Sequence, residues 1–223
     1  MKALLSFLAA SVICITTASA DWVIESKIES PQMNGAMTAK IKGDKMRVDI
    51  PNGPAGPMSS IVDTKTGDSI QVIHGQKMAM TMTGAAMKQM IDGARQKAGI
   101  KEGAGPELKA TGQSEKIEGL DCDVYTWSNG ATSAKLWVAK SHPQAAALKA
   151  WEKQLHSGFF GGMQGGPDTS KLAGPAIKTE STSQGVTVTS TITSVKEQAV
   201  DAKEFDVPAG YQSMAMPKLP AGN

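Results

Sequence analysis

Most of the chain beyond residue 20 alternates apolar and polar side chains with a period of two. Strands are expected at residues 22–29 and 69–73, among others. Because successive side chains of a strand point to opposite faces, the pattern predicts strands with one buried and one solvated face. Such strands, separated by Gly, Asn, Asp and Pro, are typical of an antiparallel sheet. Further strands are expected at residues 37–42, 45–50, 58–63, 76–83, 108–117, 123–128, 134–139, 177–182 and 186–195.

Two segments follow the helical period instead. Residues 85–97 place Met87, Met90 and Ile91 beside one another on an apolar stripe. A second helix is expected to begin at Ser141, a residue type that caps helix N-termini. Each helix needs an apolar surface of the sheet to cover. The sequence therefore predicts a mainly β fold of the α+β class with two or so helices.

The first twenty residues have the features of a secretory signal peptide. Lys2 provides the positive charge, residues 3–15 form an apolar stretch too short to span a bilayer, and residues 18–20 (ASA) form a small-residue cleavage site. We expect cleavage after Ala20 and a periplasmic mature protein that begins at Asp21. No later segment has the roughly 18 to 20 continuous apolar residues of a transmembrane helix.

Residues 21–223 are predicted to form a single domain, since about 200 residues suffice for one hydrophobic core. Residues 158–175 are rich in glycine and lack both periods, which indicates a loop. Phe159 and Phe160 within this loop need an apolar surface to cover, so the loop is a candidate lid over a binding site. Residues 212–223 are expected to form a short irregular tail.

Charge, cysteine content and motifs argue against several functions. The net charge of +2, without runs of like charge, argues against nucleic acid as a partner. Cys122 is the one cysteine beyond the leader, so no intramolecular disulfide forms, and its flanking carboxylates argue against a reactive thiol. The sequence contains no recognised catalytic, zinc-binding or phosphate-binding motif. We therefore expect no enzymatic activity and no cofactor.

Methionine is the most unusual feature of the composition, with thirteen residues against four phenylalanines. Met78, Met80 and Met82 alternate, so their side chains share one face of a strand. Met87 and Met90 follow on the next predicted helix. A methionine-lined surface adapts to ligands of variable shape, which favours a cavity for a lipid or another hydrophobic molecule. Ordinary core packing of the methionines is the alternative.

A soft metal site is a second interpretation of the same residues. Thioethers and imidazole suit Cu(I), and His74 precedes Met78 by four residues. The candidate copper ligands are His74, Met78, Met80 and Met82. Under a third interpretation the chain is an interaction module of the cell envelope, which binds a protein partner through a sheet edge or the 158–175 loop and has no ligand.

Several motifs resemble those of an uncharacterised family of exported bacterial proteins, a domain of unknown function related to the LolA-like periplasmic lipoprotein carriers and outer-membrane lipoprotein receptors. They are residues 41–49 (IKGDKMRVD), 61–67 (IVDTKTG), 76–78 (QKM), 117–122 (IEGLDC), 124–125 (VY), 136–138 (LWV) and 205–211 (FDVPAGY). The resemblance implies a curved antiparallel sheet, an unclosed half-barrel whose concave face is capped by helices and holds acyl chains. It also implies a basic residue near the cavity mouth, for which Arg47 is the candidate. A solvated cross-strand partner is the alternative role of Arg47.

Together these observations predict a periplasmic, non-enzymatic protein that binds a hydrophobic ligand, a lipid or lipoprotein acyl chains, in a methionine-lined cavity. An envelope protein is a further candidate partner. The expected binding residues are Met78, Met80, Met82, Met87, Met90, Ile91, Phe159, Phe160 and Arg47.

Overall fold

The computed structural model describes residues 20–31, 33–53, 55–97, 106–130, 132–157 and 167–216. Residues 1–19, where the signal peptide is expected, lie outside the described residues, as do residues 158–166 of the glycine-rich segment. Phe159 and Phe160 belong to the latter, so the lid that they suggest stays a prediction.

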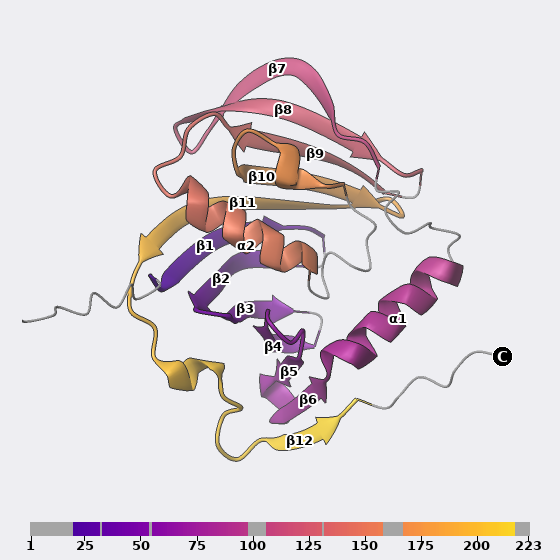
Figure 1. Ribbon diagram of the computed structural model, residues 1–223, viewed down its shortest axis with the longest axis vertical. Helices are drawn as coiled ribbons and strands as arrows, with labels where there is room; N and C mark the ends of the chain where they lie inside the picture. The colour runs from indigo at the N-terminus through magenta and orange to yellow at the C-terminus, as the bar shows by residue number, and fades with distance from the viewer. Residues whose placement is uncertain are drawn as a thin grey trace, which may run out of the picture.

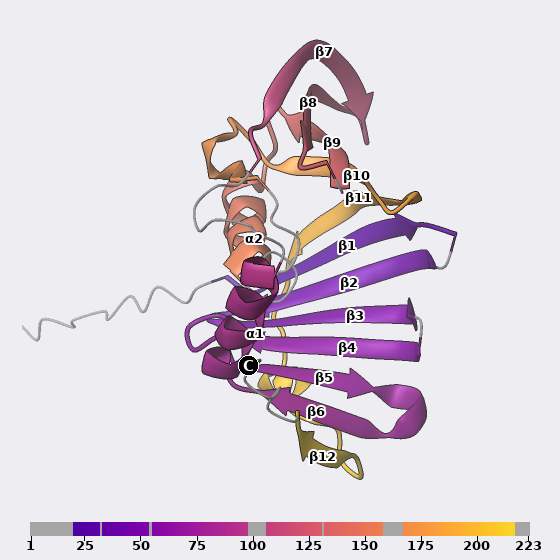
Figure 2. The same ribbon diagram turned by 90° about the vertical axis from the view of Figure 1, so that its right-hand side faces the viewer.

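Twelve strands form one sheet in the described part of the chain, in the order β12-β6-β5-β4-β3-β2-β1-β11-β10-β9-β8-β7. Neighbouring strands are antiparallel, except that β12 runs parallel to β6. The sheet is curved and unclosed, with β7 and β12 at its edges (Figure 1, Figure 2). The expectation of a mainly β fold is therefore confirmed. The strands are β1 (Trp22–Glu29), β2 (Asn34–Lys42), β3 (Lys45–Gly53), β4 (Gly56–Asp63), β5 (Ser69–Ile73), β6 (Met78–Met82), β7 (Lys109–Ile117), β8 (Leu120–Ser128), β9 (Thr132–Ala139), β10 (Ala176–Ser183), β11 (Val186–Glu197) and β12 (Gln212–Ala215).

Two α-helices accompany the sheet within the described residues, α1 (Gly84–Lys97) and α2 (Ala145–Ser157). Short 3-10 helices occur at His74–Gln76, Thr169–Lys171 and Ala202–Phe205. Figure 1 shows α2 inside the curve of the sheet and α1 across its open side. Figure 2 shows that both helices lie toward the same ends of strands β1 to β6. The helices thus flank the concave face.

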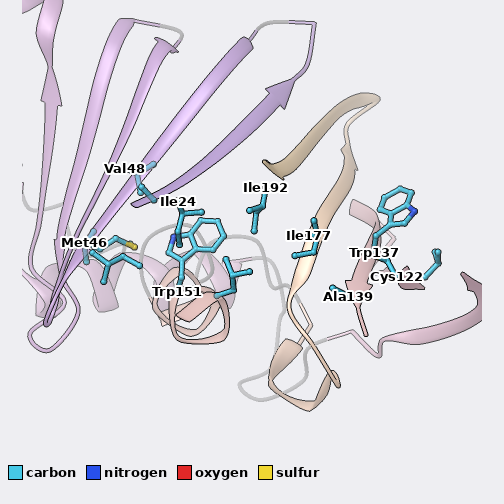
Figure 3. Close-up of a cluster of buried hydrophobic side chains, with 14 residues drawn as sticks. Ile24, Met46, Val48, Cys122, Trp137, Ala139, Trp151, Ile177 and Ile192 are labelled. Carbon is cyan, nitrogen blue, oxygen red and sulfur yellow. The ribbon is translucent and has the colours of Figure 1, made fainter. Parts of the chain in front are cut away.

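The concave face carries the main hydrophobic core. The strand register places Ile24, Ala39 and Val48 in one row on this face. Leu148 and Trp151 of α2 belong to the same buried cluster. Figure 3 shows the indole ring of Trp151 between Ile24 of β1 and Ile192 of β11. The apolar stripe of α2 therefore packs against this part of the concave face.

The convex face has a smaller core, which the segment after β11 covers. Val200 and Phe205 of this segment cluster with Ile61, Val72 and Ala79 on β4, β5 and β6. These three strands therefore bury apolar side chains on the convex side while their alternate residues face the concave side.

The structure refines two of the expected segments. Residues 212–215 are not part of an irregular tail, because they form β12 on the otherwise unpaired edge of β6. Residues 167–175, the described part of the expected loop, contain a turn of 3-10 helix at Thr169–Lys171, closed by a hydrogen bond from the Leu172 N–H to Thr169 O (3.1 Å). Both segments form backbone hydrogen bonds that the local sequence pattern does not predict.

Candidate ligand-binding site

Met78, Met80 and Met82 project from the concave face of β6. Met80 is the cross-strand partner of Gln71, whereas the intervening Ala79 lies in the convex core. All three methionines are half-buried. Their thioethers therefore lie on one face of the sheet, and part of each remains accessible.

A row of apolar side chains crosses the concave face toward these methionines. Met58 pairs with Ile50 on one side and with Ile73 on the other, and Ile73 pairs with Met78. Met37 follows Ile50 in the same register toward β1, and both pack against the main core. Ile73 is 7% exposed, and the other members of the row are half-buried. We use the name methionine floor for Met37, Ile50, Met58, Ile73, Met78, Met80 and Met82.

Helix α1 begins at the β6 end of this floor. Met87 on α1 is buried, and Met90 and Ile91 are half-buried. The first residue of the helix, Gly84, lies so close to the turn after β4 that an added Cβ would be 2.1 Å from Thr66 O. This close packing fixes where α1 leaves the sheet.

Three further methionines, on or beside the floor, are not among the expected binding residues. Met37 and Met58 lie on the floor. Each is the first residue of a predicted strand, and this position in the strand was the available signal for it. Met214 of β12 is the parallel partner of Met80 and is 49% exposed. Because this pairing joins residues far apart in the chain, no local pattern predicts that Met214 extends the floor.

Polar side chains also lie on the concave face of β4 and β5. Ser60 and Ser69 are 3% and 4% exposed. Gln71, the partner of Met80, donates a hydrogen bond from Nε2 to Ser60 Oγ (2.7 Å). Hydroxyl and amide groups therefore border the apolar floor, so this surface can contact both apolar and polar parts of a ligand.

Two hydrogen bonds tie α2 to the segment that leads into β10. Lys149 Nζ donates to Leu172 O, and the Ala176 N–H donates to Glu152 Oε1 (2.6 Å). Burial raises the pKa of Glu152 to about 7, against the opposing effects of the Ala176 N–H and the Lys149 charge. The attachment of α2 thus includes a carboxyl group that titrates near neutral pH.

Arg47 lies on the convex face, away from the methionine floor. Its guanidinium donates to Asp49 Oδ1 (2.7 Å), Ser59 Oγ (3.0 Å) and Glu204 O (2.7 Å). Arg47 therefore holds the segment after β11 against the sheet. The expectation that Arg47 lies at the mouth of a concave cavity is wrong, because Arg47 alternates with Val48, which faces the concave core.

His74 also belongs to the convex face. Its Nε2 lies 2.7 Å from Ser59 Oγ, and its Nδ1 lies 2.9 Å from Tyr211 Oη. Since the three methionines of β6 face the opposite side, the four candidate copper ligands do not form one site. Among the described residues, no group of three His, Cys, Asp or Glu side chains could hold a metal ion.

Ser59, His74 and Asp49 have the composition of a catalytic triad but not its hydrogen bonds. Ser59 Oγ lies 2.5 Å from Asp49 Oδ1 and also accepts from Arg47. A carboxylate only accepts, so the serine proton goes to Asp49, and His74 Nε2 must donate to Ser59 rather than remove its proton. Ser59 is also only 1% exposed. The cluster therefore holds the C-terminal segment in place and does not present a nucleophile.

Cys122 is fully buried in the main core. Burial raises the pKa of its thiol, and the charges of Asp121 and Asp123 raise it further. A buried thiol with a raised pKa forms little thiolate, so Cys122 is a packing residue.

Two polar hollows lie away from the methionine floor. One of about 560 Å³ lies over β7 to β10 and is lined by Glu107, Lys109, Lys135 and Glu180 with neighbouring hydroxyl groups. The other, of about 490 Å³, lies between Arg47 and the segment after β11. Neither hollow includes a residue of the methionine floor.

No helix in the described ranges is long and apolar enough to cross a membrane.

Several solved structures resemble this fold distantly. The lipoprotein LppX of Mycobacterium tuberculosis is 8% identical, with 80% of this chain and 88% of that chain covered and a TM-score of 0.43. LprF of Mycobacterium bovis is 11% identical, with 86% and 90% covered and a TM-score of 0.35. PNGF-II is 12% identical with a TM-score of 0.43, and the match covers 89% of this chain but only 32% of PNGF-II. The chain therefore spans about a third of the length of PNGF-II.

The sequence itself places the chain in a family. None of the curated proteins matches it. Residues 22–211, nearly all of the described chain, match the family DUF4412, a domain of unknown function. The expectation of an uncharacterised domain family is thereby confirmed, and the chain belongs to the DUF4412 family.

Proposed function

We propose that this protein binds a hydrophobic ligand, a lipid or an acyl chain, on the methionine floor between the sheet and the two helices. The observation that carries the proposal is the continuous apolar row from Met37 to Met78, which the described residues leave half-covered. Contiguous apolar surface that the rest of the protein leaves partly uncovered often marks a site for a ligand or partner.

The side chains of the floor suit a ligand of variable shape. Methionine is unbranched and has three rotatable bonds, so its thioether can adjust to different apolar surfaces. The floor extends across β2 to β6, and adjacent strands are about 4.8 Å apart, so it is about 20 Å long. This length fits an extended acyl chain better than a compact molecule.

The proposed role is binding without catalysis, in the periplasm. Neither the Ser59 cluster nor Cys122 offers an accessible nucleophile, and the hydroxyl groups beside the floor belong to Ser60 and Ser69, which have no histidine partner among the described contacts. The signal-peptide features of residues 1–20 support export. A carrier or a store of lipid in the envelope is consistent with both features.

The first test is native mass spectrometry of the protein purified from the envelope without detergent, followed by organic extraction and elemental analysis. Co-purified lipid-range mass supports the proposal. Stoichiometric copper would instead favour metal binding, and a bare mass that stays bare after incubation with fatty acids would contradict ligand binding.

A pair of variants tests the location of the site. Met80→Glu places a charge on the floor, whereas Thr81→Glu places the same charge on the opposite face of β6. Burying a charge against an acyl chain is unfavourable, so we expect Met80→Glu to weaken binding of a fluorescent fatty acid at least about tenfold. Thr81→Glu is expected to bind normally. Equal loss in both variants would show that the charge acts on β6 as a whole.

A further inference from the structure

Two buried polar groups in the described chain have no hydrogen-bond partner. They are the indole Nε1 of Trp151 on α2 and the hydroxyl of Ser26 on β1. Trp151 is 5% exposed and Ser26 is 2% exposed. Since buried polar groups in folded proteins are nearly always paired, two such groups require an explanation.

Both groups reach the same part of the concave face. Ser26 follows Ile24 by two residues on β1 and is the cross-strand partner of Ile192 on β11. The indole ring of Trp151 lies between Ile24 and Ile192 (Figure 3). One donor thus comes from the helix and one from the sheet, at the seam where α2 meets β1.

The same seam is continuous with the methionine floor. Ser26 is also the partner of Met37 on β2, the first residue of the floor. From Met37 the row continues through Ile50, Met58 and Ile73. A molecule with a polar group at Ser26 and an apolar chain along the row would cover the floor from end to end.

The chemistry of the two groups restricts that polar group. An indole N–H only donates, and a hydroxyl can donate to the same atom. An atom that pairs with both groups must therefore be an acceptor with two free lone pairs, which a carbonyl or carboxylate oxygen has and a hydrocarbon lacks. Leaving both donors unpaired under a bound hydrocarbon would forfeit these hydrogen bonds.

Building on the proposed function, we propose that Trp151 Nε1–H and the Ser26 hydroxyl bind a carbonyl oxygen of the ligand. The ligand class is then a fatty acid, an acyl ester or an acyl amide, with its chain on the methionine floor. Ser26 and Trp151 select the oxygenated end of the ligand, and the floor holds its apolar end.

The test compares two probes of similar apolar length, methyl palmitate and hexadecane, on the wild type and on Trp151→Phe and Ser26→Ala. Trp151→Phe keeps an aromatic ring but removes the donor, and Trp22→Phe is the matched control on the half-buried Trp22. We expect Trp151→Phe to weaken the binding of methyl palmitate about tenfold, because one buried hydrogen bond is lost. The affinity for hexadecane should not change. Ser26→Ala is expected to act in the same direction with less effect on packing.

A nuclear magnetic resonance readout separates hydrogen bonding from packing. The Trp151 indole resonance should shift when methyl palmitate is added and stay in place with hexadecane. If the variants weaken both probes equally, or if the resonance does not distinguish them, an ordered water or plain packing accounts for the unpaired groups and the inference fails. Failure of the wild type to bind either probe would instead overturn the proposed function.

Discussion

Two regions of the concave face differ in how completely they are covered. Under α2, Ile24, Leu148 and Ile177 are each at most 2% exposed. Toward β6, Met78 and Met80 remain half-buried, and α1 stands across the open side of the sheet. Both regions belong to one sheet with the same alternation of side chains. The α2 region therefore contributes more of the stability, whereas the β6 region keeps apolar surface available for an acyl chain.

The largest expected effect separates these regions by stability. Leu148→Ala removes a fully buried side chain and should lower the free energy of unfolding by about 2–5 kcal/mol. Met80→Ala removes a half-buried side chain and should cost about 1 kcal/mol or less. Urea unfolding at constant m-value measures both. Equal losses would show that the β6 region is as closed as the α2 region.

The placement of α1 predicts the next effect. Gly84→Ala would put a Cβ 2.1 Å from Thr66 O, so the start of α1 must shift, at a cost of about 1–3 kcal/mol. Gly93→Ala on the same helix meets no atom within 4 Å and should stabilise the protein by about 0.5–1 kcal/mol. Thermal unfolding measures both changes: the transition temperature should fall for Gly84→Ala and rise for Gly93→Ala.

Ligand affinity in the same two variants tests whether α1 borders the binding site. If α1 borders the site, Gly84→Ala weakens fatty-acid binding and Gly93→Ala does not. Unchanged affinity in Gly84→Ala, together with lower stability, would place the ligand entirely on the sheet.

Glu152 makes the α2 region sensitive to pH. Its pKa in the folded protein is raised to about 7, above the ordinary 4.5, because burial disfavours the charged form. The stability that the protonated Glu152 carboxyl contributes is therefore fully present below about pH 4.5, and it is lost as the pH rises through 7. Glu152→Gln keeps an acceptor for the Ala176 N–H but cannot ionise.

Stability measured against pH checks this assignment. Relative to wild type, Glu152→Gln should gain more stability at pH 8 than at pH 5, and exposed Glu197→Gln should show no such difference. A parallel pH profile for Glu152→Gln and wild type would remove Glu152 as the source of the dependence.

Much of this architecture could be predicted from the period of two. The bounds of β1 and β5 match the expected 22–29 and 69–73, and the shared face of the β6 methionines follows from alternation alone. Met46 and Val48 alternate with Arg47, which indicates that Arg47 faces the other side of the sheet. This alternation is stronger evidence for the position of Arg47 than the resemblance that implied a basic residue at a cavity mouth.

The rest depends on contacts between distant residues. The pairing of β12 with β6 cannot be inferred from residues 212–215 themselves. The start of α2 is a local exception: the helix begins at Ala145 rather than Ser141, and just before it the Gln144 N–H donates to His142 Nδ1 (3.1 Å). The unpaired groups of Ser26 and Trp151 exist only because a helix and a strand meet.

The smallest expected effect concerns why the floor contains methionine. Replacing Met78, Met80 and Met82 together by leucine conserves apolar volume, and for half-buried positions the total change should stay within about 1.5 kcal/mol. Leucine is branched and has fewer rotatable bonds, so the floor loses flexibility but not hydrophobicity.

Affinities for a series of fatty acids of different length and unsaturation measure that loss. The triple variant should bind its best ligand within about threefold of wild type and bind poorly fitting ligands much more weakly. A uniform change across the series would mean that hydrophobic area alone determines binding on the floor. In that case the methionines would differ from the leucine and isoleucine of the α2 region only in exposure, and the contrast between the two regions would lie in their helices.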